Sequence, residues 1–129
     1  MTSLAELHEL MLTESVRLES DRLSVLYHQH GERNAEDVIG RALEELAVRL
    51  AHCERLWRCE NWGEMRKCAR SLIAISEQIG MTTLARVAGD VTLAIDSCDM
   101  PAIAATLSRL SRIGEGSLTA VWDLQDLSV

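Results

Sequence analysis

The segment from Cys68 to Gly80 repeats apolar and small side chains with the period of an α-helix. At about 100° per residue, one helical face collects Met65, Cys68, Ala69, Leu72, Ile75, Ser76 and Ile79. This i, i+3, i+4, i+7 spacing is typical of a helix that packs against a hydrophobic core. The opposite face carries Arg66, Arg70, Ile73, Ala74 and Glu77. Because an isoleucine and an alanine are unusual among charged residues on a purely solvated face, we interpret this face as the candidate functional surface.

The length of 129 residues suffices for one domain with a single core. One proline and seven glycines punctuate the chain, which favours long helices joined by short turns. The net charge of −7 argues against a nucleic-acid partner. No run of about 20 apolar residues is present, and the first residues include acids in place of the basic opening of a signal peptide. We therefore expect a cytoplasmic protein that binds neither nucleic acid nor membrane.

The N-terminal part of the chain is predicted to form two helices. The first runs from about Leu4 to Gln29 and ends at Gly31, since glycine suits the residue after a helix. The second runs from about Ala35 to Arg58, with Asn34 as its N-cap.

The next two helices are bounded by a cap and a glycine. Asn61 is the expected N-cap of the third helix, with Glu64 three residues later as in a capping box. Gly80 ends this helix, because glycine adopts the left-handed conformation that follows many helices. Thr82 or Thr83 is the expected N-cap of the fourth helix.

The fifth helix is predicted to start at Asp99 as N-cap, with Pro101 in its first turn, where no amide donor is missed. Gly114 and Gly116 each weaken it by about 1 kcal/mol relative to alanine, so we expect a bend or fraying there. Short connections make successive helices antiparallel. The sequence thus predicts one all-α domain, residues 1–129, with an antiparallel four-helix bundle (34–124) and an additional N-terminal helix (1–30).

The first helix carries two apolar stripes. One contains Leu4, Leu7, Met11, Leu18, Val25 and Leu26, and the other contains Leu12, Val16, Leu23 and Tyr27. A domain of this size has few elements with which to cover both stripes. We therefore expect the second stripe to form a homodimer, and the alternative is a helix sunk in the core of a monomer.

Cysteine and histidine patterns offer little support for a metal site or an enzyme. The four cysteines have no C-x-x-C spacing and fall on or near apolar helical faces, which predicts buried free thiols, with a disulfide or metal role as the alternative. His52 and Cys53 are neighbours that point about 100° apart on a helix, so they form a poor chelating pair. The chain has no phosphate-binding glycine loop, G-x-S-x-G or H-E-x-x-H motif. We expect no metal, no cofactor and no enzymatic activity.

From Trp62 to Leu110 the chain resembles the histidine phosphotransfer (HPt) domain of bacterial two-component phosphorelays. That family has a helix with Ala-His-Ser/Thr-Leu-Lys-Gly, a segment ending in glycine, then Leu-Ala on a long helix, an Asp turn and a last helix. The matching residues are Ala69, Ser71, Leu72, Gly80, Leu84, Ala85, Asp99, Leu107 and Leu110. The resemblance implies a helical bundle that meets signalling partners through the third helix.

Three residues depart from the HPt pattern. Arg70 stands where the family has its phosphoacceptor histidine, Ile73 replaces the following lysine, and Ala74 replaces the glycine. A guanidinium stays protonated and offers no nucleophilic nitrogen, so Arg70 cannot accept a phosphoryl group. The four histidines all lie outside the third helix, and phosphorylation of one of them is an alternative.

The resemblance and its departures together suggest a signalling domain that binds a response-regulator receiver domain, or a histidine kinase, without accepting phosphate. The expected partner-binding residues are Arg66, Arg70, Ile73, Ala74 and Glu77. Two alternatives stay open. Arg70 pairs with Glu64 or Glu77 on an inert solvated face, or the chain is a helical oligomerisation module with no phosphorelay role.

Overall fold

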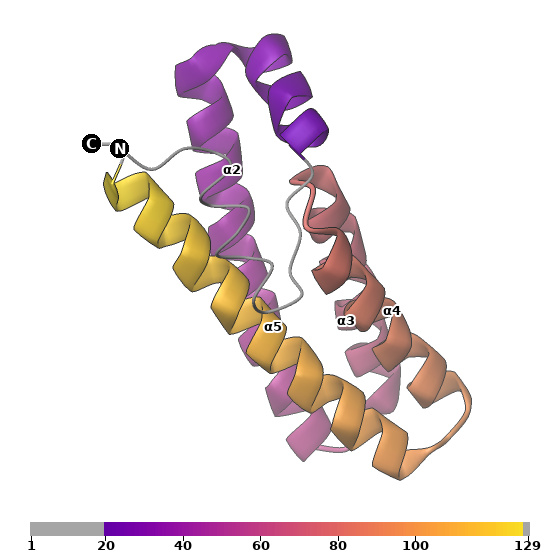
Figure 1. Cartoon of the computed structure of the whole chain (residues 1–129). Coiled ribbons are helices and arrows are strands. Elements are labelled where there is room, and N and C mark those ends of the chain that lie inside the picture. The colour runs from indigo at the N-terminus through magenta and orange to yellow at the C-terminus, as the bar shows by residue number, and fades with distance from the viewer. Residues whose placement is uncertain (1–19, 128–129) are drawn as a thin grey trace.

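The computed structural model of the chain describes residues 20–127, and it describes the side chains of residues 36–121 (Figure 1). Four helices follow one another: α2 (Ser20–Arg58), α3 (Trp62–Gln78), α4 (Thr82–Asp96) and α5 (Met100–Leu127). No strand occurs within this described range. The predicted all-α class is therefore confirmed.

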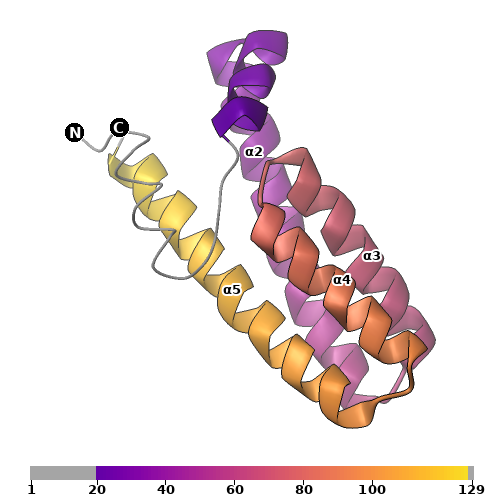
Figure 2. The ribbon, with the colours of Figure 1, turned by 45° about the vertical axis from the view of Figure 1, so that its right-hand side comes forward.

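Helix α2 corrects the predicted boundary between two helices. It is one helix of 39 residues, so the expected end at Gly31 and restart at Asn34 are wrong. A glycine inside a helix costs about 1 kcal/mol relative to alanine, which flanking helical turns can offset. Figures 1 and 2 show that the first turns of α2 bend away from the line of the rest of this helix.

The residues expected to form a homodimer fall at the edge of what the structure describes. Leu12 and Val16 lie outside the described residues. Leu23 and Tyr27 lie in α2, at positions whose side chains are not described.

Three of the predicted helix boundaries are confirmed by their hydrogen bonds and backbone angles. Asn61 Oδ1 accepts a bond from the Glu64 amide at 3.4 Å, so Asn61 caps α3. Gly80 follows α3 with a φ of 76°, in the left-handed region that favours glycine. Asp99 Oδ1 accepts a bond from the Ala102 amide at 3.1 Å at the start of α5.

The start of α4 and the course of α5 differ from prediction. Met81 is the N-cap of α4 and makes no side-chain cap bond, so neither Thr82 nor Thr83 has the predicted role. The buried Met81 is held by its backbone instead, because its amide donates to Ser76 O at 2.8 Å. Helix α5 runs without a break through Gly114 to Leu127, so the expected fraying does not occur.

The core lies between the four helices. Helices α2 and α4 each pack against both α3 and α5, as Figures 1 and 2 show. Fully buried side chains from all four helices meet there, among them Leu43, Leu46, Met65, Leu72, Leu84, Val87, Ile103 and Leu110. This core fixes which face of α3 and α4 is left outward.

Candidate functional site

The outward face of α3 is the one that the sequence indicates. The predicted inner residues Met65, Cys68, Ala69, Leu72, Ser76 and Ile79 are buried, and Ile75 is half-buried against the core. On the other side Arg70, Ala74 and Glu77 are exposed, and Arg66 is half-buried. The helical periodicity therefore separated the two faces correctly.

Ile73 is less exposed than its place among charged residues indicates. It is half-buried and packs against the core cluster. Its Cδ1 atom lies 4.0 Å from the position that a Cβ on Gly89 would occupy. The missing side chain of Gly89 on α4 thus gives Ile73 a surface to cover, and Ile73 offers a partner only part of its side chain.

Arg66 is already paired with a carboxylate of α4. Its Nε donates to Asp96 Oδ1 at 2.7 Å, and its Nη2 donates to Asp96 Oδ2 at 3.1 Å. These hydrogen bonds, helped by the charges of Arg66 and Arg70, hold the pKa of Asp96 below its ordinary value, and they raise the pKa of Arg66. Arg66 therefore joins α3 to α4 and is a weaker candidate for binding a partner than its sequence position indicates.

Arg70 has no such pairing. It is exposed and makes no hydrogen bond or ion pair with another residue in the range 36–121. Glu64 pairs with Lys67 instead, at 3.2 Å. The alternative in which Arg70 binds Glu64 or Glu77 is therefore wrong, and its guanidinium is open to an external anion.

Leu93 belongs to the same surface and was missed by sequence reasoning. Arg66 meets Asp96, and Ile73 approaches Gly89, so the turn of α3 with Arg70 lies beside the turn of α4 with Leu93. Leu93 is 64% exposed, the largest fraction among the exposed large hydrophobic side chains of the described part. Its signal was available, because Gly89, Leu93 and Asp96 are spaced four and three residues apart on one helical face.

We call this surface, made of Arg66, Arg70, Ala74, Leu93 and Asp96, the α3–α4 face. It combines one free guanidinium, an ion pair and exposed apolar side chains, a mixture that is found at the centres of protein interfaces. It contains no histidine or other group that could carry a phosphoryl group as a nitrogen nucleophile.

The described residues bring no metal-binding cluster together, and the four cysteines differ in their exposure. No group of three or more His, Cys, Asp and Glu side chains among the described residues could hold a metal ion. All four cysteines are free, as predicted, and Cys53 and Cys68 are buried. Cys59 and Cys98 are exposed, which corrects the expectation of burial, because they lie in the turns that follow α2 and α4.

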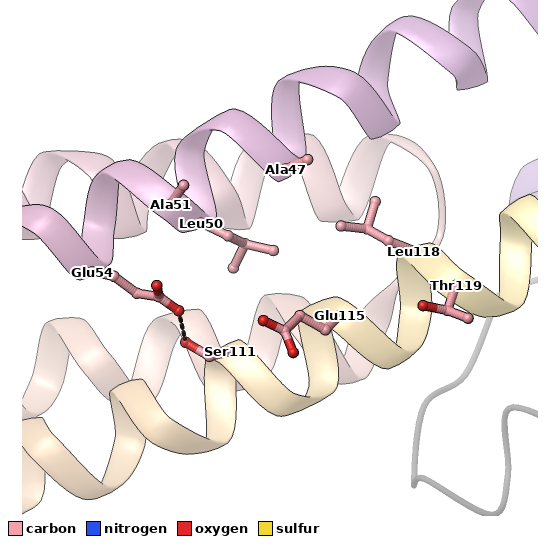
Figure 3. A pocket seen from close by; sticks show the side chains of 8 residues that line it. All are labelled: Ala47, Leu50, Ala51, Glu54, Ser111, Glu115, Leu118 and Thr119. Carbon is pink, nitrogen blue, oxygen red and sulfur yellow. Dashed lines mark hydrogen bonds between the residues drawn. The ribbon is translucent and has the colours of Figure 1, made fainter.

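A groove between α2 and α5 is the second feature of the surface (Figure 3). It has a volume of about 280 Å³ and is lined by Ala47, Leu50, Ala51, Glu54, Ser111, Glu115, Leu118 and Thr119. Figure 3 shows Leu50 and Leu118 reaching into the space between the helices, while Ser111 Oγ donates to Glu54 Oε1 at 2.6 Å. The groove is mainly apolar and holds no arrangement of groups that indicates a reaction.

No family model matches the sequence, and the searches of curated proteins and of solved structures found no match. Among the described helices, none has the length and apolar character needed to cross a membrane. The function must therefore be argued from the residues of the α3–α4 face.

Proposed function

We propose that the protein is a pseudo-phosphotransfer signalling domain that binds the receiver domain of a response regulator without accepting phosphate. The observation that carries the proposal is the exposed guanidinium of Arg70, unpaired among residues 36–121, at the position that resembles the HPt phosphoacceptor. Such a partner places the chain in the cytoplasm.

The short turns between successive helices support this proposal. Turns of only three residues separate α2 from α3, α3 from α4, and α4 from α5. Connections this short place successive helices antiparallel, and each of α2 and α4 packs on both α3 and α5. We infer an antiparallel four-helix bundle of the HPt type, in which α3 takes the place of the helix with the phosphoacceptor.

The charge of Arg70 indicates which groups of a partner this face can bind. A guanidinium is a planar fork of donors that binds carboxylate or phosphate with two hydrogen bonds. The pocket of a receiver domain is acidic, so it offers carboxylates to Arg70. Leu93 and Ala74 lie beside this charge and supply apolar area, and interface centres combine such apolar area with arginine anchors.

Titration calorimetry of the full chain with the receiver domains encoded in the same genome tests the proposal. We expect Arg70→Ala and Leu93→Asp each to weaken binding about tenfold or more, a loss of about 1.4 kcal/mol. Matched controls are Arg109→Ala and Val48→Asp, because Arg109 and Val48 are exposed on α5 and α2, away from the α3–α4 face. The controls should bind like the wild type, and circular dichroism should show that all four variants are folded.

Two results contradict the proposal. If no receiver domain binds the wild type, the oligomerisation module becomes the better explanation. If a kinase or phosphorylated receiver transfers acid-labile phosphate to the chain, the domain is a working phosphotransferase through one of its histidines.

A further inference from the structure

Two of the four thiols lie together in the interface between α2 and α3. Cys53 of α2 and Cys68 of α3 are both buried. The Sγ atom of Cys68 lies 3.2 Å from the backbone oxygen of Arg49, to which it donates. In an α-helix the carbonyl of residue 49 faces the amide of residue 53, so the Cys68 sulfur lies against the turn of α2 that carries Cys53.

The two thiols differ in acidity. The neighbouring Cys53 thiol lowers the pKa of Cys68, against the effect of burial, and Arg49 and Ser71 lower it further. The same contact with Cys68, together with burial, raises the pKa of Cys53. Cys68 is therefore the more acidic thiol of the two.

We propose that Cys53 and Cys68 are a redox-active dithiol that closes to an intramolecular disulfide between α2 and α3 when a peroxide oxidises the protein. The Cys68 thiolate attacks one oxygen of hydrogen peroxide, the O–O bond breaks, and Cys68 becomes a sulfenic acid while the departing hydroxide takes a proton to form water. The Cys53 sulfur then attacks the Cys68 sulfur, the S–O bond breaks, and the Cys53 proton leaves with the hydroxide as a second water. The two sulfur atoms give up two electrons and the peroxide takes them.

The other two cysteines do not share this arrangement. Cys59 and Cys98 are exposed in turns, so their thiols are accessible to external thiols and to other copies of the chain. Their replacement by serine isolates the buried pair without touching the core. The Cys59→Ser/Cys98→Ser chain is therefore the reference protein for the test.

The experiment exposes the folded reference protein to hydrogen peroxide and measures its intact mass and its thiols. We expect the mass to fall by that of two hydrogen atoms. After denaturation, neither of the two remaining cysteines should react with iodoacetamide. A peptide map should show Cys53 linked to Cys68, and dithiothreitol should restore both thiols. The urea midpoint of unfolding should rise on oxidation, because the link closes the loop that contains the α2–α3 turn.

Single replacements test the roles of the two sulfurs. Adding Cys53→Ser should abolish the disulfide and leave a Cys68 sulfenic acid that dimedone traps. Adding Cys68→Ser should leave Cys53 unlabelled. The proposal is overturned if oxidation of the reference protein gives sulfinic acid or links between chains. It is also overturned if the protein does not change at a peroxide concentration that oxidises free cysteine. These results are measured on the reference protein and do not depend on the folding of the single variants.

Discussion

Asp96 is the residue at which the electrostatics of the α3–α4 face can be measured directly. Arg66 holds its carboxylate with two hydrogen bonds and lowers its pKa from the ordinary value of 3.8. Because the folded pKa is the lower one, the pair stabilises the fold above the unfolded pKa, and this contribution is lost as the pH falls through the folded pKa. The pair is therefore intact at neutral pH and opens only in acid.

We expect Arg66→Gln to raise the pKa of Asp96 towards its ordinary value, because the variant removes the positive charge and the two guanidinium N–H donors that bind the carboxylate. The carbon chemical shift of the Asp96 carboxyl, followed through an acid titration by NMR, measures this change. Arg109→Gln on α5 is the matched control and should leave the Asp96 titration as in the wild type. An Asp96 curve that is the same in Arg66→Gln and wild type contradicts the assigned cause.

At the residue scale, sequence reasoning succeeded where the cause is local. Asn61 and Asp99 were found as caps because the hydrogen bonds they accept come from amides three residues later. Ile73 was misjudged because its burial depends on Gly89, which lies on another helix. Leu93 was missed for a related reason, since its importance comes from the residue beside it in space, Arg70.

At the scale of elements, the contact between α2 and α5 depends on one glycine. A Cβ at Gly114 would lie 2.5 Å from Leu50 Cδ1, which is closer than such carbon atoms approach, and 3.1 Å from Leu50 Cδ2, which is a tight contact. The sequence treats Gly114 only as a weak point in a helix. The structure shows that this glycine makes room for Leu50, and that the helix continues through the position where fraying was expected.

We expect Gly114→Ala to lower the free energy of unfolding by about 1 kcal/mol, because overpacking of about 1 to 3 kcal/mol outweighs about 1 kcal/mol of helix propensity. In a Leu50→Ala background the same change should raise the free energy of unfolding, because the clash is gone. Gly40→Ala is the control, since nothing lies within 4 Å of a Cβ at Gly40. It should stabilise the protein by about 0.5 to 1 kcal/mol.

Urea unfolding of the four variants and the wild type gives these free energies. A Gly114→Ala variant that gains as much stability as Gly40→Ala would show that Leu50 moves aside at no cost into the adjacent groove. If Gly114→Ala changes the free energy of unfolding equally in the wild type and in the Leu50→Ala background, Gly114 and Leu50 are not coupled.

Helix boundaries show a similar limit of sequence reasoning at this scale. Gly31 and Asn34 have the chemistry of a helix end and a helix start, yet α2 passes through both. Capping residues indicate where a helix can stop, and the packing of the rest of the chain decides whether it does. At Met81 the reverse holds, because backbone bonds start α4 where no side chain caps it.

At the scale of the whole molecule, composition and periodicity were enough for the helical class and for the inner face of α3. Within residues 36–121, whose side chains the structure describes, the core cluster runs from Ile39 to Val121 and draws on all four helices. This distribution bears on the oligomerisation alternative, in which the function lies in the N-terminal residues. It allows the two proposals to be separated by a truncation.

We expect a chain of residues 36–129 to fold on its own, because it contains the core cluster from Ile39 to Val121, to which all four helices contribute. Its far-ultraviolet circular dichroism should be helical, and urea should unfold it in one cooperative transition that different probes report alike. Because the α3–α4 face is retained, it should bind a receiver domain with the affinity of the full chain. Sedimentation of both chains shows whether residues 1–35 hold a dimer together, and a fragment that unfolds without cooperativity contradicts the independence of this core.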